Sequence, residues 1–157
     1  MIPEQIEKAL NLMIEIYKVK EKGYHPFLIR EGWQVAQLNY MPEQDIDNIQ
    51  RLDIHHLTDE VFILLKGYAV LISATVGNAQ VDFELELMKP NLTYNIPKGT
   101  WHNIAMTQGC EMIIVEKSNT HVSDFDHYEL KDTSLQELKN RVNQLFDSIN
   151  DVKSDGQ

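Results

Sequence analysis

The sequence contains a single cysteine among 157 residues, Cys110, so no disulfide can form within the chain. A lone thiol is typical of a reducing compartment. No stretch approaches the roughly 18 consecutive apolar residues of a membrane span. The N-terminal segment lacks the apolar core of a secretory signal, because Glu4, Glu7 and Glu15 interrupt it. These absences predict a cytoplasmic protein that does not cross a membrane.

Basic residues are also scarce relative to acidic ones. The chain has 14 Lys and Arg against 24 Asp and Glu, a formal net charge of −10. Such an excess of acid repels phosphate backbones and anionic lipid headgroups, so nucleic acid and membrane surfaces are not expected as partners. The hydrophobic fraction of 43% is nevertheless that of an ordinary globular protein. At this length the chain predicts one domain.

Both ends of the sequence have the apolar periodicity of a helix. We expect an N-terminal helix within residues 1–24, a C-terminal helix over 133–150, and a flexible tail over 151–157. In the first helix the apolar residues recur at spacings of three and four, which would place them on one face. These residues are Ile6, Leu10, Met13, Ile14 and Tyr17.

The region between the two predicted helices, residues 25–132, has the pattern of short strands separated by turns. Residues 81–87 alternate strictly between apolar and acidic side chains, as a strand with one buried face does. Residues 61–65 are apolar throughout, so both faces of that strand must be covered. One cover would be the opposing sheet, and the other a terminal helix or a second copy of the chain, which predicts a homodimer. The fold class is therefore all-β, an antiparallel sandwich or barrel with a helix at each end.

Two separated segments contain residues that can bind a metal ion. The first contains His55, His56 and Glu60, and the second, residues 96–103, contains His102. Two imidazoles and one carboxylate on one face suit non-haem iron and leave coordination positions open. The same set can hold zinc, manganese or nickel. A divalent transition metal is thus the expected cofactor.

These segments resemble the two motifs of the cupin superfamily, over about residues 50–116. The second half of the first motif is His, three residues, Glu, six residues, Gly, which His56, Glu60 and Gly67 match. The second motif, Pro-x-Gly-x-x-His, is matched over residues 97–102. The resemblance implies a jelly-roll β-barrel with the site inside it. The family's upstream glycine is absent here, and so is one histidine of its His-x-His.

Two ligand sets remain open, because neighbouring residues of one strand point to opposite faces. One set is His56, Glu60 and His102. The other uses Asp53 and His55 together with Glu60 and His102. The first set is favoured because His56 and Glu60 would share one face of a single strand.

Two functions follow from this reading. The first is a metal-dependent enzyme acting on a small molecule, by isomerase-type or oxygenase-type chemistry, with His102 and Glu60 as catalytic residues. The second is a small-ligand-binding or sensory module without metal and without catalysis. In both cases the expected partners are a small molecule and a second copy of the chain. The remaining histidines, and Asp124 with Asp126, are expected to lie on the solvated surface.

Overall fold

The computed structural model describes residues 6–8 and 13–154, and for residues 6–8 it describes only the backbone. The elements run in the order β1 (Ile6–Lys8), β2 (Tyr17–Val19), β3 (Gly23–Arg30), β4 (Trp33–Asn39), η1 (Pro42–Gln44), β5 (Arg51–Ile54), β6 (Glu60–Lys66), β7 (Ala69–Val76), β8 (Val81–Leu87), β9 (Tyr94–Ile96), β10 (Trp101–Met106), β11 (Glu111–Glu116), α1 (Thr120–Ser123), β12 (Asp126–Glu129) and α2 (Asp132–Ser154).

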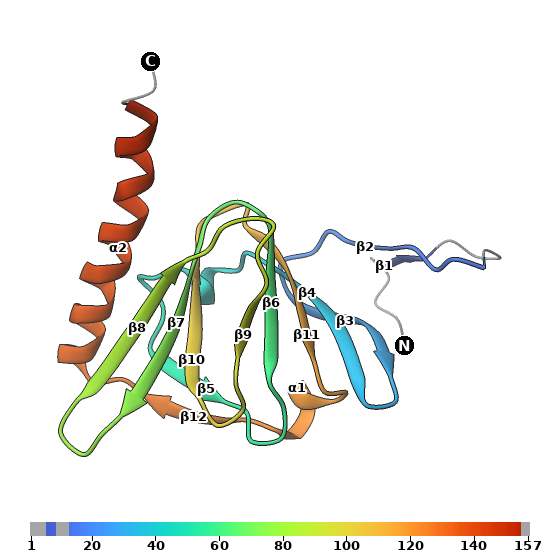
Figure 1. Ribbon diagram of the computed structural model, residues 1–157, viewed down its shortest axis with the longest axis horizontal. Coiled ribbons are helices and arrows are strands. Elements are labelled where there is room, and N and C mark those ends of the chain that lie inside the picture. Colours follow the sequence, from blue (N-terminus) through green and yellow to red (C-terminus); the bar gives the residue numbers. More distant parts are fainter. Residues whose placement is uncertain (1–5, 9–12, 155–157) are drawn as a thin grey trace.

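Two five-stranded antiparallel sheets face each other (Figure 1). One has the strand order β3-β4-β11-β6-β9, and the other has the order β12-β5-β10-β7-β8. The chain alternates between the sheets after β4, after β5 and again after β6, as a jelly roll requires. The predicted all-β class with a C-terminal helix is confirmed.

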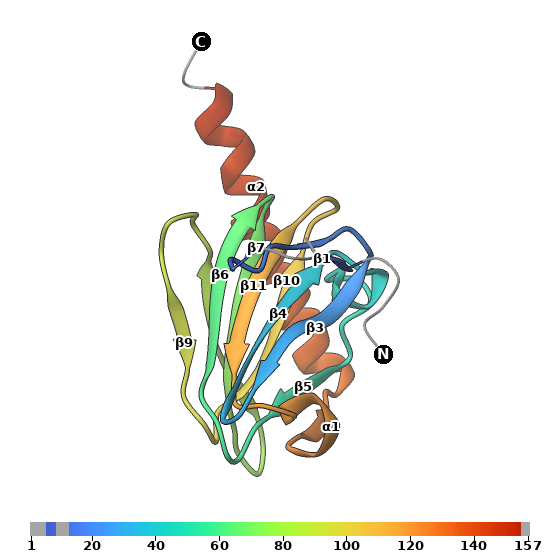
Figure 2. The same cartoon turned by 90° about the vertical axis from the view of Figure 1, so that its right-hand side faces the viewer.

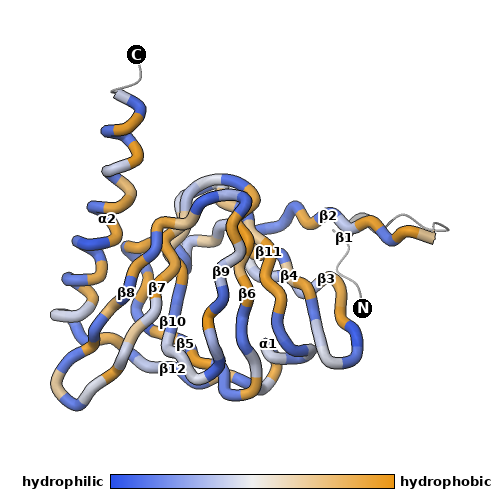
Figure 3. The backbone as a smooth tube through the Cα atoms, in the orientation of Figure 1, coloured by the Kyte–Doolittle hydropathy of each residue, from blue (hydrophilic) through white to orange (hydrophobic). Residues whose placement is uncertain are grey.

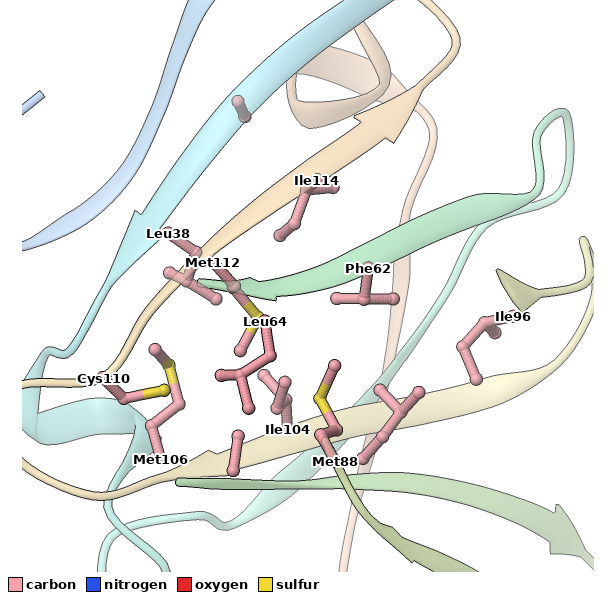
Figure 4. Packing of buried hydrophobic residues seen from close by; sticks show 13 residues of the cluster. Leu38, Phe62, Leu64, Met88, Ile96, Ile104, Met106, Cys110, Met112 and Ile114 are labelled. Carbon is pink, nitrogen blue, oxygen red and sulfur yellow. The ribbon is translucent and has the colours of Figure 1, made fainter. Parts of the chain in front are cut away.

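The space between the sheets is filled by apolar side chains from both of them (Figure 4). From the first sheet, β6 contributes Phe62 and Leu64, and from the second, β10 contributes Ile104 and Met106. Figure 4 shows these side chains converging on one another. Cys110 lies in the same core, and burial raises the pKa of its thiol to about 12, which disfavours the reactive thiolate form.

A second core lies between the β12-β5-β10-β7-β8 sheet and helix α2. The helix buries Leu138 and Val142 against strand residues that include Ile72 and Phe83. Figure 3 shows apolar and polar residues alternating along α2, as expected for a helix with one covered face. Strand β7 is therefore covered on both faces, which explains its continuous apolar run Ala69–Ile72.

Strand β6 also has an apolar outer face, but α2 covers the other sheet. Val61 and Ile63 are only partly buried, and Leu65 is 49% exposed. In Figure 2 the outer face of the β6 sheet is turned toward the viewer, and neither helix of the described residues crosses it. A terminal helix was one expected cover for this strand. The C-terminal helix α2 is present, but it packs on the opposite sheet.

The expected N-terminal helix does not form in the described part of residues 1–24; residues 1–5 and 9–12 lie outside that part. Instead Ile6–Lys8 pairs with Tyr17–Val19 as an antiparallel ribbon. The β-branched and aromatic residues of this segment fit strands as well as a helix stripe, and two residues of the expected helix face, Met13 and Ile14, are exposed. The C-terminal helix extends to Ser154, through part of the expected tail, and residues 155–157 are not described.

Within the described residues no helix combines the length and apolar character needed to cross a bilayer. The cytoplasmic localisation stays a prediction.

Candidate functional site

Three side chains from both sheets meet at one end of the space between the sheets. His55 directly follows β5, His102 lies on β10 beside it, and Glu60 begins β6 in the opposite sheet. Glu60 Oε2 lies 2.8 Å from His102 Nε2 and 3.1 Å from His55 Nε2. One ligand atom from each residue lies within 4.8 Å of the other two. Glu60 and His102 are buried, and His55 is mostly so.

The orientation of both imidazoles is fixed by backbone carbonyl groups. His55 Nδ1 lies 2.6 Å from the oxygen of Asp124, and His102 Nδ1 lies 2.9 Å from the oxygen of Thr100. A carbonyl oxygen only accepts, so each Nδ1 carries the proton and donates it. In the neutral tautomer each Nε2 then carries a lone pair, and this lone pair is directed at Glu60. Three electron-pair donors face one another, an arrangement that a cation or two added protons must stabilise.

Without a metal ion, protons take that role. Burial disfavours charge on His55, but its hydrogen bond and ion pair with Glu60 raise its pKa to about 9. Burial likewise acts against the charged form of His102, and the contact with Glu60 again raises the pKa. Burial would raise the pKa of Glu60, yet the hydrogen bonds from the two histidines hold it well below its usual range. In the metal-free site the contacts with Glu60 thus favour the protonated form of both histidines, and the histidines favour the carboxylate form of Glu60.

The two sequence-based ligand sets can now be compared with the structure. His56, which was favoured over His55, points outward, is exposed, and pairs with Asp126 at 2.8 Å. The argument from strand parity was wrong for this pair, because β5 ends at Ile54 and β6 begins at Glu60 in the other sheet. The intervening residues form a turn, and alternation does not continue through a turn.

Of the alternative set, the structure brings three residues together and leaves Asp53 outside the group. His55 lies beside Glu60 and His102, as that set requires. Asp53 pairs in register with His102 across β5 and β10 and lines the same cavity. Its carboxylate, however, is bound by His127 Nδ1 at 2.6 Å, and Asp53 is outside the His55–Glu60–His102 group. Asp53 therefore forms part of the wall around that group.

Asp124, expected on the solvated surface, is buried and holds the turn that carries His55. Its two carboxylate oxygens accept hydrogen bonds from the backbone N–H groups of His56 and Leu57, both at 2.9 Å. Burial acts against this charge, but the two N–H donors lower the pKa of Asp124 overall. The sequence gave little indication of this contact, since Asp124 lies 67 residues from Leu57.

A second carboxylate, Glu116, lies next to the first. It ends β11, and β11 pairs with β6 so that Glu116 follows the Val115–Val61 pair toward Glu60. Glu116 Oε1 accepts hydrogen bonds from the Tyr24 hydroxyl and from Gln34 Nε2. Burial and the charge of Glu60 raise the pKa of Glu116, and burial with Glu116 raises that of Tyr24.

These residues were missed by the sequence analysis, although a signal was present. Glu116 has the same parity as the buried Met112 and Ile114 of its strand, and Gln34 has the parity of the buried Ala36. A polar residue on the buried face of a strand is a candidate for a site or an internal hydrogen-bond network.

The two carboxylates and the histidines line a cavity of about 460 Å³. Its walls are mostly apolar near the base, where Phe62, Ile104 and Ile114 contribute. Polar and aromatic side chains line the rest, including Arg51, Asn103, His121, Phe125 and His127. A mostly apolar cavity with a few convergent polar groups is typical of a small-molecule site.

Comparison with known proteins supports this fold. No protein-family model matches the chain, and no curated protein sequence matches it. A histidine-to-glutamine variant of Streptomyces PAC13 with uridine has a TM-score of 0.52 and 13% identity, covering 85% of this chain and 92% of that one. A structure of Pac13, described as a unique nucleoside dehydratase with a β-barrel, has a TM-score of 0.50 and 13% identity, covering 81% and 88%.

A cupin-2 domain-containing protein from Shewanella frigidimarina is also similar, with a TM-score of 0.41 and 19% identity over 62% of this chain and 83% of that one. Together with the two-sheet strand order, the similarity to Pac13 shows the architecture: the chain has a two-sheet antiparallel β-barrel fold like that of Pac13. Its His55–Glu60–His102 group could hold a metal ion.

Proposed function

We propose that this protein binds one divalent transition-metal ion through His55, Glu60 and His102 and a small molecule in the adjoining cavity. One observation carries the proposal: both Nδ1–H groups donate to backbone carbonyls, so both Nε2 lone pairs are directed at the Glu60 carboxylate. Two imidazoles and one carboxylate are a set that Fe²⁺, Zn²⁺, Mn²⁺ and Ni²⁺ all accept.

When bound, the ion would supply Lewis-acid chemistry at an oxygen atom of the substrate. The chain's own residues would bind and enclose that substrate. Phe62, Ile104 and Ile114 would exclude water from the base of the cavity. Glu60 and His102, the residues expected to be catalytic, would then act as ligands. The reaction would be of isomerase, oxygenase or dehydratase type.

A second function uses the same residues without metal. The Glu60 contacts raise the pKa of both histidines, so His55 and His102 could donate protons to a substrate while Glu60 holds them in place. A non-catalytic ligand-binding module is the third possibility. The Pac13 similarity motivates nucleosides as the first compounds to test.

Elemental analysis of protein purified without added metal tests the first function. We expect close to one transition-metal ion per chain, retained through gel filtration. Titration of metal-free protein with Zn²⁺, Mn²⁺ and Ni²⁺ should give one site that His102→Ala removes while the fold is kept. Unchanged stoichiometry in His102→Ala would refute this ligand set. A protein that takes up none of these ions, yet processes or binds a nucleoside, would support the metal-free functions.

A homodimer is the assembly we propose, through the outer face of the β6 sheet. The apolar side chains on that face are only partly buried within one chain. They are Val61, Ile63, Leu65, Ile113 and Val115. Light scattering should give twice the chain mass for the wild type and the monomer mass for Ile63→Lys. A monomeric wild type at micromolar concentration would refute this.

A further inference from the structure

Glu116 has one oxygen atom whose hydrogen-bonding capacity is unused. Its side chain is 3% exposed, and among the described residues Glu116 Oε2 has no hydrogen-bond partner. Its other oxygen, Oε1, accepts from Tyr24 and Gln34. The carboxyl group is therefore fixed at one oxygen and free at the other. A buried carboxyl oxygen without a partner destabilises the fold, so its presence calls for an explanation.

The free oxygen belongs to the cavity and not to the metal-ligand group. Glu116 Oε2 lies 4.0 Å from His55 Nε2, and Glu116 lines the same cavity as the proposed metal ligands. No ligand atom of Glu116 joins the three donors of His55, Glu60 and His102 that lie within 4.8 Å of one another. A group bound beside His55 would meet Glu116 Oε2.

The network behind Glu116 holds its carboxyl group in one orientation. Gln34 is fully buried, and its amide donates to Glu116 Oε1 at 3.0 Å, while its oxygen accepts from the backbone N–H of Asn119 at 2.8 Å. Tyr24 adds a second donor to the same Oε1. Such support is what a binding residue needs to keep its geometry before the ligand arrives.

The surroundings of Glu116 Oε2 limit which chemical group of a ligand could hydrogen-bond to it. A carboxylate or phosphate oxygen carries no hydrogen to donate. An ammonium group would share the cavity with the guanidinium group of Arg51, which has the same charge. A hydroxyl group is uncharged and both donates and accepts, so it pairs with Glu116 in either protonation state. A second unpartnered buried acceptor, Gln44 Oε1, lines the same cavity and also requires a donor.

We propose that Glu116 is the specificity-determining residue of this cavity and that its Oε2 binds a hydroxyl group of a hydroxyl-bearing small molecule. This rests on the proposed function only in placing the ligand in the same cavity, and it does not require the metal. The hydroxyl group would sit beside His55, with the apolar part of the molecule against Phe62 and Ile114.

Three probes with the same apolar skeleton test the proposal: 2-phenylethanol, phenylacetate and 2-phenylethylamine. Their binding is measured by ligand-observed NMR on the wild type, Glu116→Leu and Glu116→Gln, each with and without Zn²⁺. We expect Glu116→Leu to weaken 2-phenylethanol at least fivefold while phenylacetate binds as well or better. Glu116→Gln, which keeps a polar atom at the Oε2 position, should stay within twofold for the alcohol.

Equal binding of 2-phenylethanol by the wild type and Glu116→Leu would overturn the proposal, and so would a parallel loss of all three probes. Zinc stoichiometry on the same samples separates this test from the metal site. Zinc bound normally by Glu116→Leu leaves the proposed function intact whatever the probes show. A wild type that takes up none of Zn²⁺, Mn²⁺ and Ni²⁺ refutes the metal-binding function but leaves the alcohol comparison valid.

A measurement on the wild type covers the case in which Glu116→Leu does not fold. With ¹³C-labelled glutamate, 2-phenylethanol should shift the side-chain carboxyl resonance of Glu116, assigned by its absence in Glu116→Gln. Ethylbenzene, which lacks the hydroxyl group, should leave it in place. Equal shifts with both compounds would overturn the proposal.

Discussion

The Nδ1 atom of His55 lies 2.6 Å from the backbone oxygen of Asp124, a residue 69 positions further along the chain. The side chain of Asp124 returns to the same turn and binds the N–H groups of His56 and Leu57. One residue thus fixes both the path of the backbone around His55 and the tautomer of its ring. The orientation of His55 toward Glu60 depends on this long-range contact.

Asp124→Ala should destabilise the protein by about 1–3 kcal/mol, because it leaves two backbone N–H groups without their charged acceptor. Metal affinity should fall about 10-fold or more, since the turn that orients His55 is loosened. Urea unfolding and zinc titration measure the two effects. Asp126→Ala is the control: it removes only the exposed pair with His56 and should change stability by less than about 1 kcal/mol. Equal effects of the two variants would contradict the role given to Asp124.

His55→Ala and His56→Ala form a matched pair of neighbouring substitutions. Removing the inward ring should weaken zinc binding by about 100-fold or more, because the site loses one of three ligands. Removing the outward ring should leave the affinity within about twofold, because His56 contacts only Asp126 at the surface. Isothermal titration calorimetry gives both values. A larger loss in His56→Ala would restore the ligand set first favoured from the sequence.

Stability and metal affinity should respond to pH with opposite signs. In metal-free protein the pKa of His55 is raised to about 9 from 6.5, so this contribution to stability is complete below pH 6.5 and is lost as the pH rises through 9. Metal binding displaces the protons, so zinc affinity should increase over the same range, by up to about tenfold per pH unit for each proton released. Urea unfolding and zinc titrations from pH 6 to 9 measure the two trends. His55→Ala should flatten both.

At acidic pH the ionisation of Glu60 makes stability fall as the pH falls, the opposite of the effect of His55. Contacts with the two histidines hold the pKa of Glu60 at about 2, below its ordinary 4.5. The stabilisation from this carboxylate is present above pH 4.5 and is lost as the pH falls toward 2. Acid unfolding of Glu60→Gln should therefore be less steep than that of the wild type in this window. Identical acid transitions would show that Glu60 is not ionised between the histidines.

The glycines of the two motifs should differ in their tolerance of a side chain. Gly67 has a φ of +80°, and a Cβ placed there would lie 2.7 Å from Cys110 Cα. Gly99 has a φ of +76° with nothing within 4 Å of the added atom. Gly99→Ala should cost about 1 kcal/mol of backbone strain, and Gly67→Ala should cost clearly more, about 3 kcal/mol, because the backbone of Cys110 must also move. Thermal unfolding distinguishes them; equal losses would mean that the contact is relieved without cost.

The sequence predicted the central strands and the second motif, because both depend on local patterns, but it gave no signal for the strands Gly23–Arg30, Arg51–Ile54 and Asp126–Glu129. Alternation located the strand at Val81–Leu87, and the spacing from Pro97 to His102 placed a buried histidine on β10. The choice between His55 and His56 could not be settled locally. It depends on a turn between two sheets and on Asp124, which reaches that turn from far along the chain.

The ends of the chain show a different limit. The spacing of Ile14 and Tyr17 suits a helix face, but a helix face is stable only when something covers it. Helix α2 has a sheet to cover it at Leu138 and Val142, whereas Met13 and Ile14 of the expected N-terminal helix are exposed. Both segments have the apolar periodicity of a helix, but only the C-terminal one forms a helix that packs on a sheet.

The site takes its imidazoles from one sheet and its carboxyl groups from the other. Any occupant that binds both kinds of group therefore links the two halves of the sandwich. Slow separation of the sheets would admit solvent to this end of the molecule, and an occupant would oppose it. Amide exchange along β6 and β10 should accordingly slow when the cavity is filled, which makes exchange protection a way to search for the natural ligand without assuming a reaction.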